Sequence, residues 1–155
     1  MNEYYKNLPK KRMGAGALFL NDDEEVLIVK PSYKDHWSIP GGTVDDNESP
    51  KAACIREIKE EINLDASHVT FLCVDYSPRE SDEKNESLRF IFYAGVLTDS
   101  EISNIKLDNK ELVEFRFAPV SEAEKLLGHK LARRLPKCMD AIKTGTSIYL
   151  ENGNF

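Results

Sequence analysis

The segment 50–62 limits the fold of this chain more than any other feature of the sequence. Ser49 suits the N-cap of a helix, and Pro50 suits the first helical position because its missing N–H would have no partner there. The apolar residues that follow recur at helical spacing and lie on one side of the predicted helix: Ile55, Ile58 and Ile62. The sequence therefore predicts an amphipathic helix over 50–62, anchored to a core through its isoleucines.

Short strand patterns precede and follow this helix. Runs of apolar, β-branched and aromatic residues predict strands over 13–20, 26–29, 69–76, 88–97 and 112–117. The turn residues 21–23 join the first two into a β-hairpin. The glycine- and proline-rich stretch 31–42 and the charged stretch 78–87 are expected to be loops.

Two further helices are expected near the end of the chain. Ser121 and Glu124 have the spacing of a capping box that opens one helix, and 131–142 is predicted to be the last, before a fraying tail. Strands with helices between and after them, in this order, predict an α/β (α+β) fold with a mixed sheet.

Length and charge limit the functional classes. The 155 residues suit one ordinary domain, and because no repeat or linker is visible we expect a single domain over 1–155. With 27 acidic and 21 basic residues the net charge is −6, which argues against duplex nucleic acid as the main partner. No apolar run approaches the roughly 18 residues needed to cross a bilayer, and the N-terminus lacks a signal-peptide pattern. We expect a cytoplasmic protein with no membrane partner.

The spacing of the cysteines and histidines predicts neither disulfides nor a zinc site. The three cysteines lie far apart without a CxxC pair, so they are expected to be buried reduced thiols: Cys54, Cys73 and Cys138. The three histidines lack ligand spacing, which argues against zinc: His36, His68 and His129.

Glu57, Glu60 and Glu61 share the helix face opposite the isoleucines. At i, i+3 and i+4 they project within an arc of about 100°. Carboxylates so placed are most often the solvated face of a helix, but their repulsion is relieved by a hard divalent cation, and oxygen-rich sites suit magnesium or manganese. Small neighbours, Ala53 and Cys54, are expected to leave room above the helix.

The residues from Gly42 to Leu64 resemble the Nudix box, G-x5-E-x7-R-E-U-x-E-E-x-G-U with U aliphatic. Eight of the nine defined positions match: Gly42, Glu48, Arg56, Glu57, Ile58, Glu60, Glu61 and Leu64. Asn63 stands where the family has glycine, and asparagine is the next best residue for a left-handed backbone, so this departure does not indicate a dead site. The preceding stretch 37–42 is similar to the family's usual lead-in.

The resemblance implies a Nudix-type α/β/α sandwich with a central mixed sheet and Mg²⁺- or Mn²⁺-dependent hydrolysis of a nucleoside diphosphate linked to another group. It implies a small nucleotide substrate: a nucleotide sugar, ADP-ribose or a (deoxy)nucleoside triphosphate. The resemblance is also compatible with a homodimer. The metal ligands it implies are the Gly42 carbonyl, Glu57, Glu60 and Glu61, with Glu111 as first candidate and Glu114 as second candidate for a further carboxylate. Glu48 and Arg56 would form an ion pair that orients the loop and the helix, and Glu57 is a candidate base.

Substrate contacts are predicted more loosely. Candidates for phosphate contacts are Lys30, Lys34, Arg79 and Arg89, and candidates for stacking on a base are Tyr33, Trp37 and Tyr76; solvated surface and core packing are the commoner roles of such residues. Pro78 lies near the position where ADP-ribose-cleaving members carry a proline.

Two other functions stay open. One is a non-catalytic, nucleotide-binding regulatory Nudix module, although such modules usually lack box glutamates. The other is an RNA 5′-end pyrophosphohydrolase, against which the acidic net charge weighs, although basic residues do gather near the N-terminus: Lys6, Lys10, Lys11 and Arg12.

Overall fold

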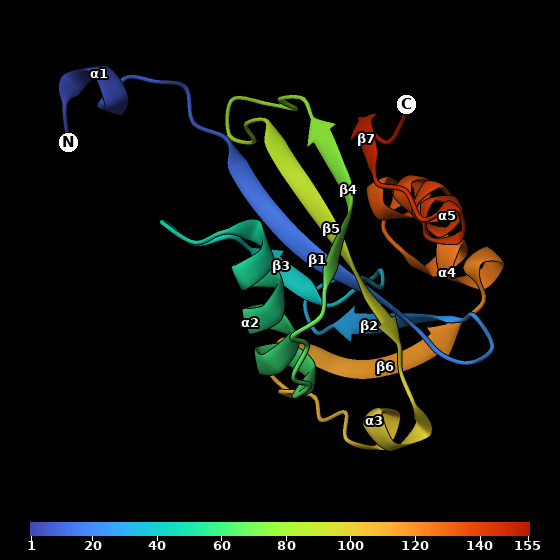
Figure 1. Cartoon of the computed structure of the whole chain (residues 1–155). Helices are drawn as coiled ribbons and strands as arrows, with labels where there is room; N and C mark the ends of the chain where they lie inside the picture. The colour runs from blue at the N-terminus through green and yellow to red at the C-terminus, as the bar shows by residue number, and fades with distance from the viewer.

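In the computed structural model, strand β1 (Arg12–Leu20) lies at the centre of the sheet, where it pairs with three other strands (Figure 1). Along one edge it pairs in parallel with β5 (Ser87–Val96) over its whole length. Along the other edge it pairs first with the short β3 (Gly41–Thr43), and only Leu20 pairs with Val26 of β2 (Val26–Pro31). The predicted hairpin is therefore present, but β2 leaves β1 directly after the turn and opens the sheet.

The outer strands complete a mixed sheet of seven strands. β2 pairs antiparallel with β6 (Leu112–Ala118), and β5 pairs antiparallel with β4 (Thr70–Ser77). β4 pairs in parallel with β7 (Ile148–Glu151) at the far edge. The order is β6-β2-β1-β5-β4-β7, with β3 beside β1.

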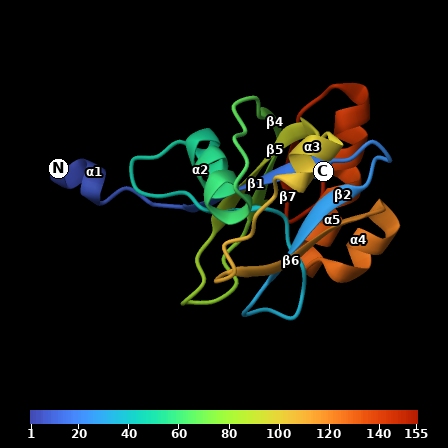
Figure 2. The same cartoon turned by 90° about the horizontal axis from the view of Figure 1, so that it is seen from below.

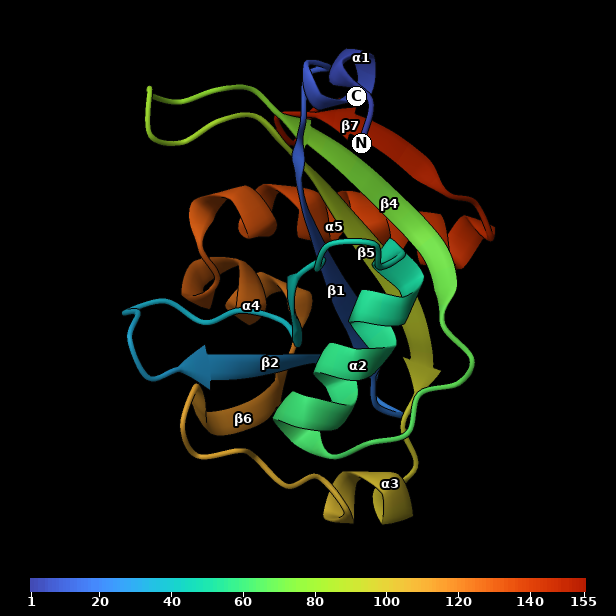
Figure 3. The ribbon, with the colours of Figure 1, turned by 90° about the vertical axis from the view of Figure 1, so that its left-hand side faces the viewer.

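Helices cover both faces of the sheet, as Figures 2 and 3 show. α2 (Pro50–Ile62) lies on one face, and α4 (Val120–Leu126) and α5 (His129–Thr144) lie on the other. The short α1 (Glu3–Lys6) buries no residue, and α3 (Asp99–Ser103) lies in the connection from β5 to β6. The predicted α/β/α sandwich with a central mixed sheet is confirmed. No helix is both long and apolar enough to cross a membrane.

The sheet separates two hydrophobic cores because successive side chains of β1 point to opposite faces. Ala15, Ala17 and Phe19 pack on the α2 side, and Leu18 and Leu20 pack on the α4 and α5 side. All three cysteines are buried and unpaired, which confirms the prediction of buried thiols.

Helix α2 begins and ends where the sequence predicts. The Ser49 side chain accepts a hydrogen bond of 3.0 Å from the amide of Ala52, and Pro50 occupies the first turn. Asn63 ends the helix in the left-handed conformation with φ of 62°, the conformation that glycine would otherwise supply. The departure from the family pattern at Asn63 therefore preserves the helix end.

Several expectations were wrong. Ser121 and Glu124 form no capping box, because the N-cap of α4 is Pro119, two residues before Ser121, which places Ser121 inside the first turn. The capping box of the structure belongs to Thr98 and Glu101 at α3. The expected loop 31–42 ends within β3, and the tail expected to fray contains β7, which is held by pairing with β4.

Candidate active site

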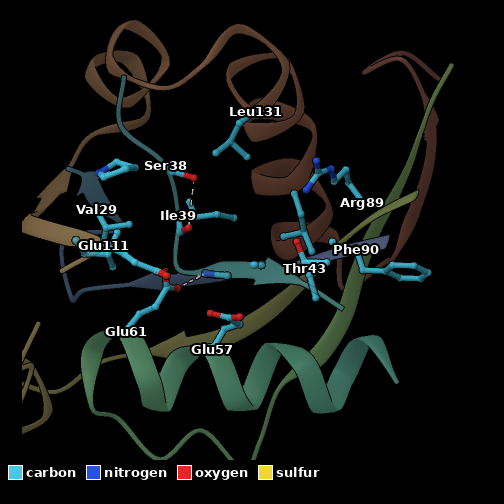
Figure 4. Close-up of a pocket in the computed structure, with 18 of the residues that line it drawn as sticks. Val29, Ser38, Ile39, Thr43, Glu57, Glu61, Arg89, Phe90, Glu111 and Leu131 are labelled. Atoms are coloured by element: carbon cyan, nitrogen blue, oxygen red, sulfur yellow. Dashed lines mark hydrogen bonds between the residues drawn. The ribbon is translucent and has the colours of Figure 1, made fainter. Parts of the chain in front are cut away.

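A cleft of about 490 Å³ lies where β2 separates from β1 (Figure 4). Its floor is glycine-rich backbone from β1 and β3, so no side chain fills the opening. Glu57 and Glu61 of α2 and Glu111, just before β6, line one side, and Arg89 of β5 lies on the other (Figure 4). The cleft thus places carboxylates and a cation on opposite sides of one space.

Glu57 lies directly over Gly42. A Cβ atom at Gly42 would be only 2.6 Å from Oε1 of Glu57, so the carboxylate occupies the space that a side chain would need. Its side chain is 14% exposed, and burial raises its pKa, opposed by the hydrogen bond from Arg56. Glycine at this position is therefore what lets a carboxylate approach the backbone of β3.

Glu61 is the more deeply buried carboxylate, with 6% of the residue exposed. The backbone amide of Gly41 donates a hydrogen bond of 2.7 Å to its Oε1. Burial raises the pKa of Glu61 to about 8, opposed by that hydrogen bond and reinforced by repulsion from Glu57 and Glu111. Burial disfavours the ionised form of this carboxyl group, and a bound cation would stabilise that form.

The expectation that the three glutamates form a face opposite the core was wrong. Glu57 and Glu61 point toward the sheet, because the glycines of β3 leave space and a backbone donor beneath them. Ala53 and Cys54 do not border open space; they are fully buried in the core on this side of the sheet. The Glu60 side chain is 59% exposed and does not line the cleft.

Arg56 connects the loop before α2 to the carboxylates. It donates two hydrogen bonds to Glu48, of 2.8 and 2.9 Å, so the predicted ion pair is present. It also donates to Glu57 at 2.9 Å and to Glu60 at 3.3 Å. The guanidinium holds the pKa of Glu48 at about 2, and these carboxylates raise the pKa of Arg56. Glu57 is therefore positioned by the same guanidinium that fixes the loop.

Glu111 lies beside Glu61 in the cleft (Figure 4), where it contributes to the raised pKa of Glu61. Its backbone is fixed by hydrogen bonds on both sides: its amide donates to Asp108 and its carbonyl accepts from Ser32. The second candidate, Glu114, is exposed on β6 and does not line the cleft. Of the two candidates, the structure places only Glu111 with the α2 carboxylates.

The residues present fit a hard divalent cation by chemistry, although they do not form a closed site. No three histidine, cysteine or carboxylate side chains are close enough together to hold a metal ion as they stand. The possible metal ligands at the cleft, which are the carboxylates and the Gly42 carbonyl, all offer oxygen atoms, and oxygen ligands suit such a cation. The metal-ligand set that the family implies therefore stays a prediction.

The other predicted contacts divide into two groups. Tyr33, Lys34 and Arg89 line the cleft. The rest have partners elsewhere: Lys30 donates to the carbonyls of Pro31 and Lys34, Arg79 to Asn85, and Tyr76 to Glu86.

Trp37 is buried, with the guanidinium carbon of Arg116 4.7 Å from its ring centre, so it packs in the core.

Sequence reasoning missed Leu131 and Arg134 of α5, which also line the cleft. Arg134 is buried and bonded to Asp75 of β4, 59 residues earlier. Nothing local in the sequence links these two residues, because only the packing of α5 on the sheet brings them together.

The family model of the NUDIX domain matches residues 10–138 of this chain. The chain belongs to the Nudix family. Relatives include Nudix hydrolase 5 of Arabidopsis thaliana, 29% identical over 116 residues that are 72% of this chain and 37% of that protein.

Two shorter matches carry other names. The 8-oxo-dGTP diphosphatase of Proteus vulgaris is 36% identical over 67 residues, 41% of this chain and 60% of that protein. The RNA pyrophosphohydrolase of Hydrogenovibrio crunogenus is 38% identical over 61 residues, 39% of this chain and 37% of that protein. The chain therefore spans between about a third and three fifths of the length of these curated relatives.

Solved Nudix structures share the fold. A UDP-X diphosphatase superposes with a TM-score of 0.74 at 20% identity, covering 96% of this chain and 70% of that chain. The MutT protein of Methanosarcina mazei Go1 superposes with a TM-score of 0.71 at 19% identity, covering 88% and 99%. At these identities the likeness concerns the fold alone.

Proposed function

We propose that this Nudix protein is a metal-dependent pyrophosphohydrolase that cleaves the diphosphate linkage of a nucleoside diphosphate derivative. The observation that carries the proposal is the pair of inward-facing carboxylates, Glu57 over Gly42 and Glu61 bonded to Gly41. Burial of a carboxylate destabilises a fold unless the charge is paired or a ligand binds it, and carboxylates in such environments are common at functional sites. The Nudix box supplies the reaction class.

The ligands we assign to a bound Mg²⁺ or Mn²⁺ are Glu57, Glu61, Glu111 and the Gly42 carbonyl. Glu60 would join them once its exposed side chain turns from Arg56 into the cleft. Bound there, the cation would neutralise diphosphate oxygens and make a water molecule more acidic. Arg56 holds Glu57 in the cleft and also bonds Glu48, so it ties Glu57 to the loop before α2. A cleft carboxylate without such a partner is suited to accept the water's proton. Glu111 meets that condition, whereas Glu57, the other candidate base, is bonded to Arg56.

The substrate range that we propose follows the relatives, whose names include a nucleoside triphosphate and RNA. A nucleotide sugar, ADP-ribose or a (deoxy)nucleoside triphosphate fits a cleft of this size. An RNA 5′ end is the second candidate, favoured by the match to an RNA pyrophosphohydrolase. A cytoplasmic location belongs to the same proposal.

A phosphate-release screen with Mg²⁺ or Mn²⁺ tests the proposal. The panel holds ADP-ribose, nucleotide sugars, dinucleoside polyphosphates, (deoxy)nucleoside triphosphates and a 5′-triphosphorylated RNA. Glu61→Gln is the inactive control, because glutamine keeps an acceptor for the Gly41 amide and removes the charge. We expect metal-dependent turnover that the variant abolishes. A folded, metal-binding protein that turns over none of these would favour the regulatory binding module.

A further inference from the structure

A second cavity, of about 570 Å³, adjoins the cleft on the side away from α2. It lies between the loop before β3, the β4–β5 connection and the start of α5, and it shares Lys34, Ser38, Arg89, Leu131 and Arg134 with the cleft. A group bound in the cleft can therefore extend into this cavity without crossing the fold.

The lining of this cavity is strongly basic. It has one carboxylate, Glu80, which is already bonded to Lys84 and Lys130. The cationic side chains are Arg12, Lys34, Lys84, Arg89, Lys130 and Arg134. Such an excess stands out in a chain whose net charge is −6. Like charges gathered at one place are unfavourable unless an anion binds among them.

Arg89 shows how this excess arises. On the neighbouring strand its direct partner is Asp75, the carboxylate expected to neutralise it. Asp75 instead accepts from Arg134 and, at 3.0 Å, from the amide of Gly153, so its oxygens are committed. Arg89 is half-buried with no ion pair, and burial and repulsion from Arg134 and Arg12 lower its pKa.

The backbone makes room for this unpaired guanidinium. A Cβ atom at Gly14 of β1 would collide with it, so glycine lets Arg89 lie flat on the sheet between the two cavities. From there Arg89 can donate toward either space, and Arg12 at the start of β1 lines the second cavity but not the cleft. Guanidinium groups are well suited to bidentate contacts with phosphate oxygens.

We propose that this basic cavity binds a further phosphate group of the substrate, so that the preferred substrates carry a phosphate monoester in addition to the diphosphate. The inference rests on the proposed function, because the diphosphate is what would lie at the carboxylates. It narrows the substrate class from any nucleoside diphosphate derivative to phosphorylated ones, whichever ester position reaches Arg89 and Arg12.

Binding can be measured without turnover. The probes are 5′-AMP, adenosine 2′,5′-bisphosphate and adenosine 3′,5′-bisphosphate, which contain no anhydride bond to cleave, so calorimetry can be done with Mg²⁺ present. Wild type should bind one bisphosphate at least about tenfold more tightly than 5′-AMP. Arg89→Gln and Arg12→Gln should each reduce this preference to about threefold or less. Arg133→Gln, an exposed arginine of α5 outside the cavity, should keep it.

Equal binding of the three probes, or binding of none, would overturn the inference, as would an equal loss in Arg133→Gln. Initial rates with NADPH against NADH, and with coenzyme A against dephospho-coenzyme A, separate this result from the proposed function. A bisphosphate preference without any turnover would contradict the proposed reaction and support the cavity. Turnover of both members of a pair at equal kcat/KM would support the proposed reaction and contradict the phosphate-binding role of the cavity.

Discussion

The backbone amide of Gly41 donates a hydrogen bond of 2.7 Å to Oε1 of Glu61, so a buried carboxylate joins α2 to β3 inside the cleft. Glu61→Gln keeps an acceptor for this bond and loses the charge. We expect it to lower metal-dependent turnover by about two orders of magnitude or more without destabilising the fold. Glu61→Ala also leaves the amide unpaired, which costs about 1–3 kcal/mol of unfolding free energy. Steady-state rates and urea denaturation of both variants check this pair of expectations.

The raised pKa of Glu61 gives a pH dependence. In the unfolded chain the carboxyl releases its proton near pH 4.5, and in the metal-free folded protein near pH 8. The folded state holds the extra proton between these values, so the free energy of unfolding falls as pH rises from 4.5 to 8 and then levels off. Urea denaturation in EDTA should show this fall in wild type and in Glu60→Gln. The fall should be largely absent in Glu61→Gln. An unchanged pH dependence of the unfolding free energy in that variant would show that Glu61 is not its source.

The two glycines of β3 should respond differently to alanine. Gly41 has φ of 154°, and a Cβ atom there would lie 2.2 Å from the carbonyl oxygen of Ala15, so Gly41→Ala must distort the sheet and lower the thermal midpoint. At Gly42 the nearest atoms to such a Cβ are those of the Glu57 carboxylate, the end of a side chain that can turn away, rather than backbone. We expect Gly42→Ala to fold and to lose turnover. The reverse order of stability between the variants would contradict the cleft geometry.

Arg56→Lys tests the guanidinium as a positioning group. An ammonium cannot donate two parallel bonds to Glu48 and also reach Glu57, so Glu57 should lose its orientation. We expect kcat to fall by about tenfold or more, with a smaller change in KM. Arg133→Lys, outside the cleft, is the matched control. A change confined to KM would mean that Arg56 binds substrate directly.

Replacement of Arg134 and replacement of Arg89 should change the free energy of unfolding differently, although both cations line the same cavity. Arg134→Met leaves Asp75 buried without its partner, which costs about 3–5 kcal/mol of unfolding free energy. Arg89→Met removes a cation that has no ion pair and is repelled by its neighbours, so the unfolding free energy should stay equal or rise. Equal losses in urea denaturation would show that Arg89 has a stabilising partner.

Much of the fold could be predicted from local pattern. The N-cap, the apolar spacing and the left-handed end of helix 50–62 all depend on residues within or next to the helix, and the predicted bounds are confirmed. β3 and β7 were missed for a physical reason. Gly41–Thr43 has almost no side chain to show a pattern, and Ile148–Glu151 is a strand only because β4 pairs with it from far along the chain.

The candidate site was predictable only in part. Spacing placed Glu57, Glu60 and Glu61 on one arc, but it could not tell that Gly41 supplies a donor beneath Glu61 while Arg56 holds Glu60 outside. Helical periodicity describes a helix by itself, and the direction of its polar face is decided by the sheet. The commitment of Asp75 to Arg134, which leaves Arg89 unpaired, depends on packing between three separate segments.

The acidic wall of the cleft comes almost entirely from one continuous stretch, 41–61, whereas the cations opposite come from the start of β1, from β5 and from α5. Within this stretch Arg56 bonds Glu48, Glu57 and Glu60, so a change at one of these positions alters the contacts of the others. Among the cations, Arg134 is bonded to Asp75, but Arg12 and Arg89 form no ion pair. Descendants of this chain can therefore exchange Arg12 and Arg89 one at a time, and so change what binds on the basic side, while the carboxylate side stays as it is.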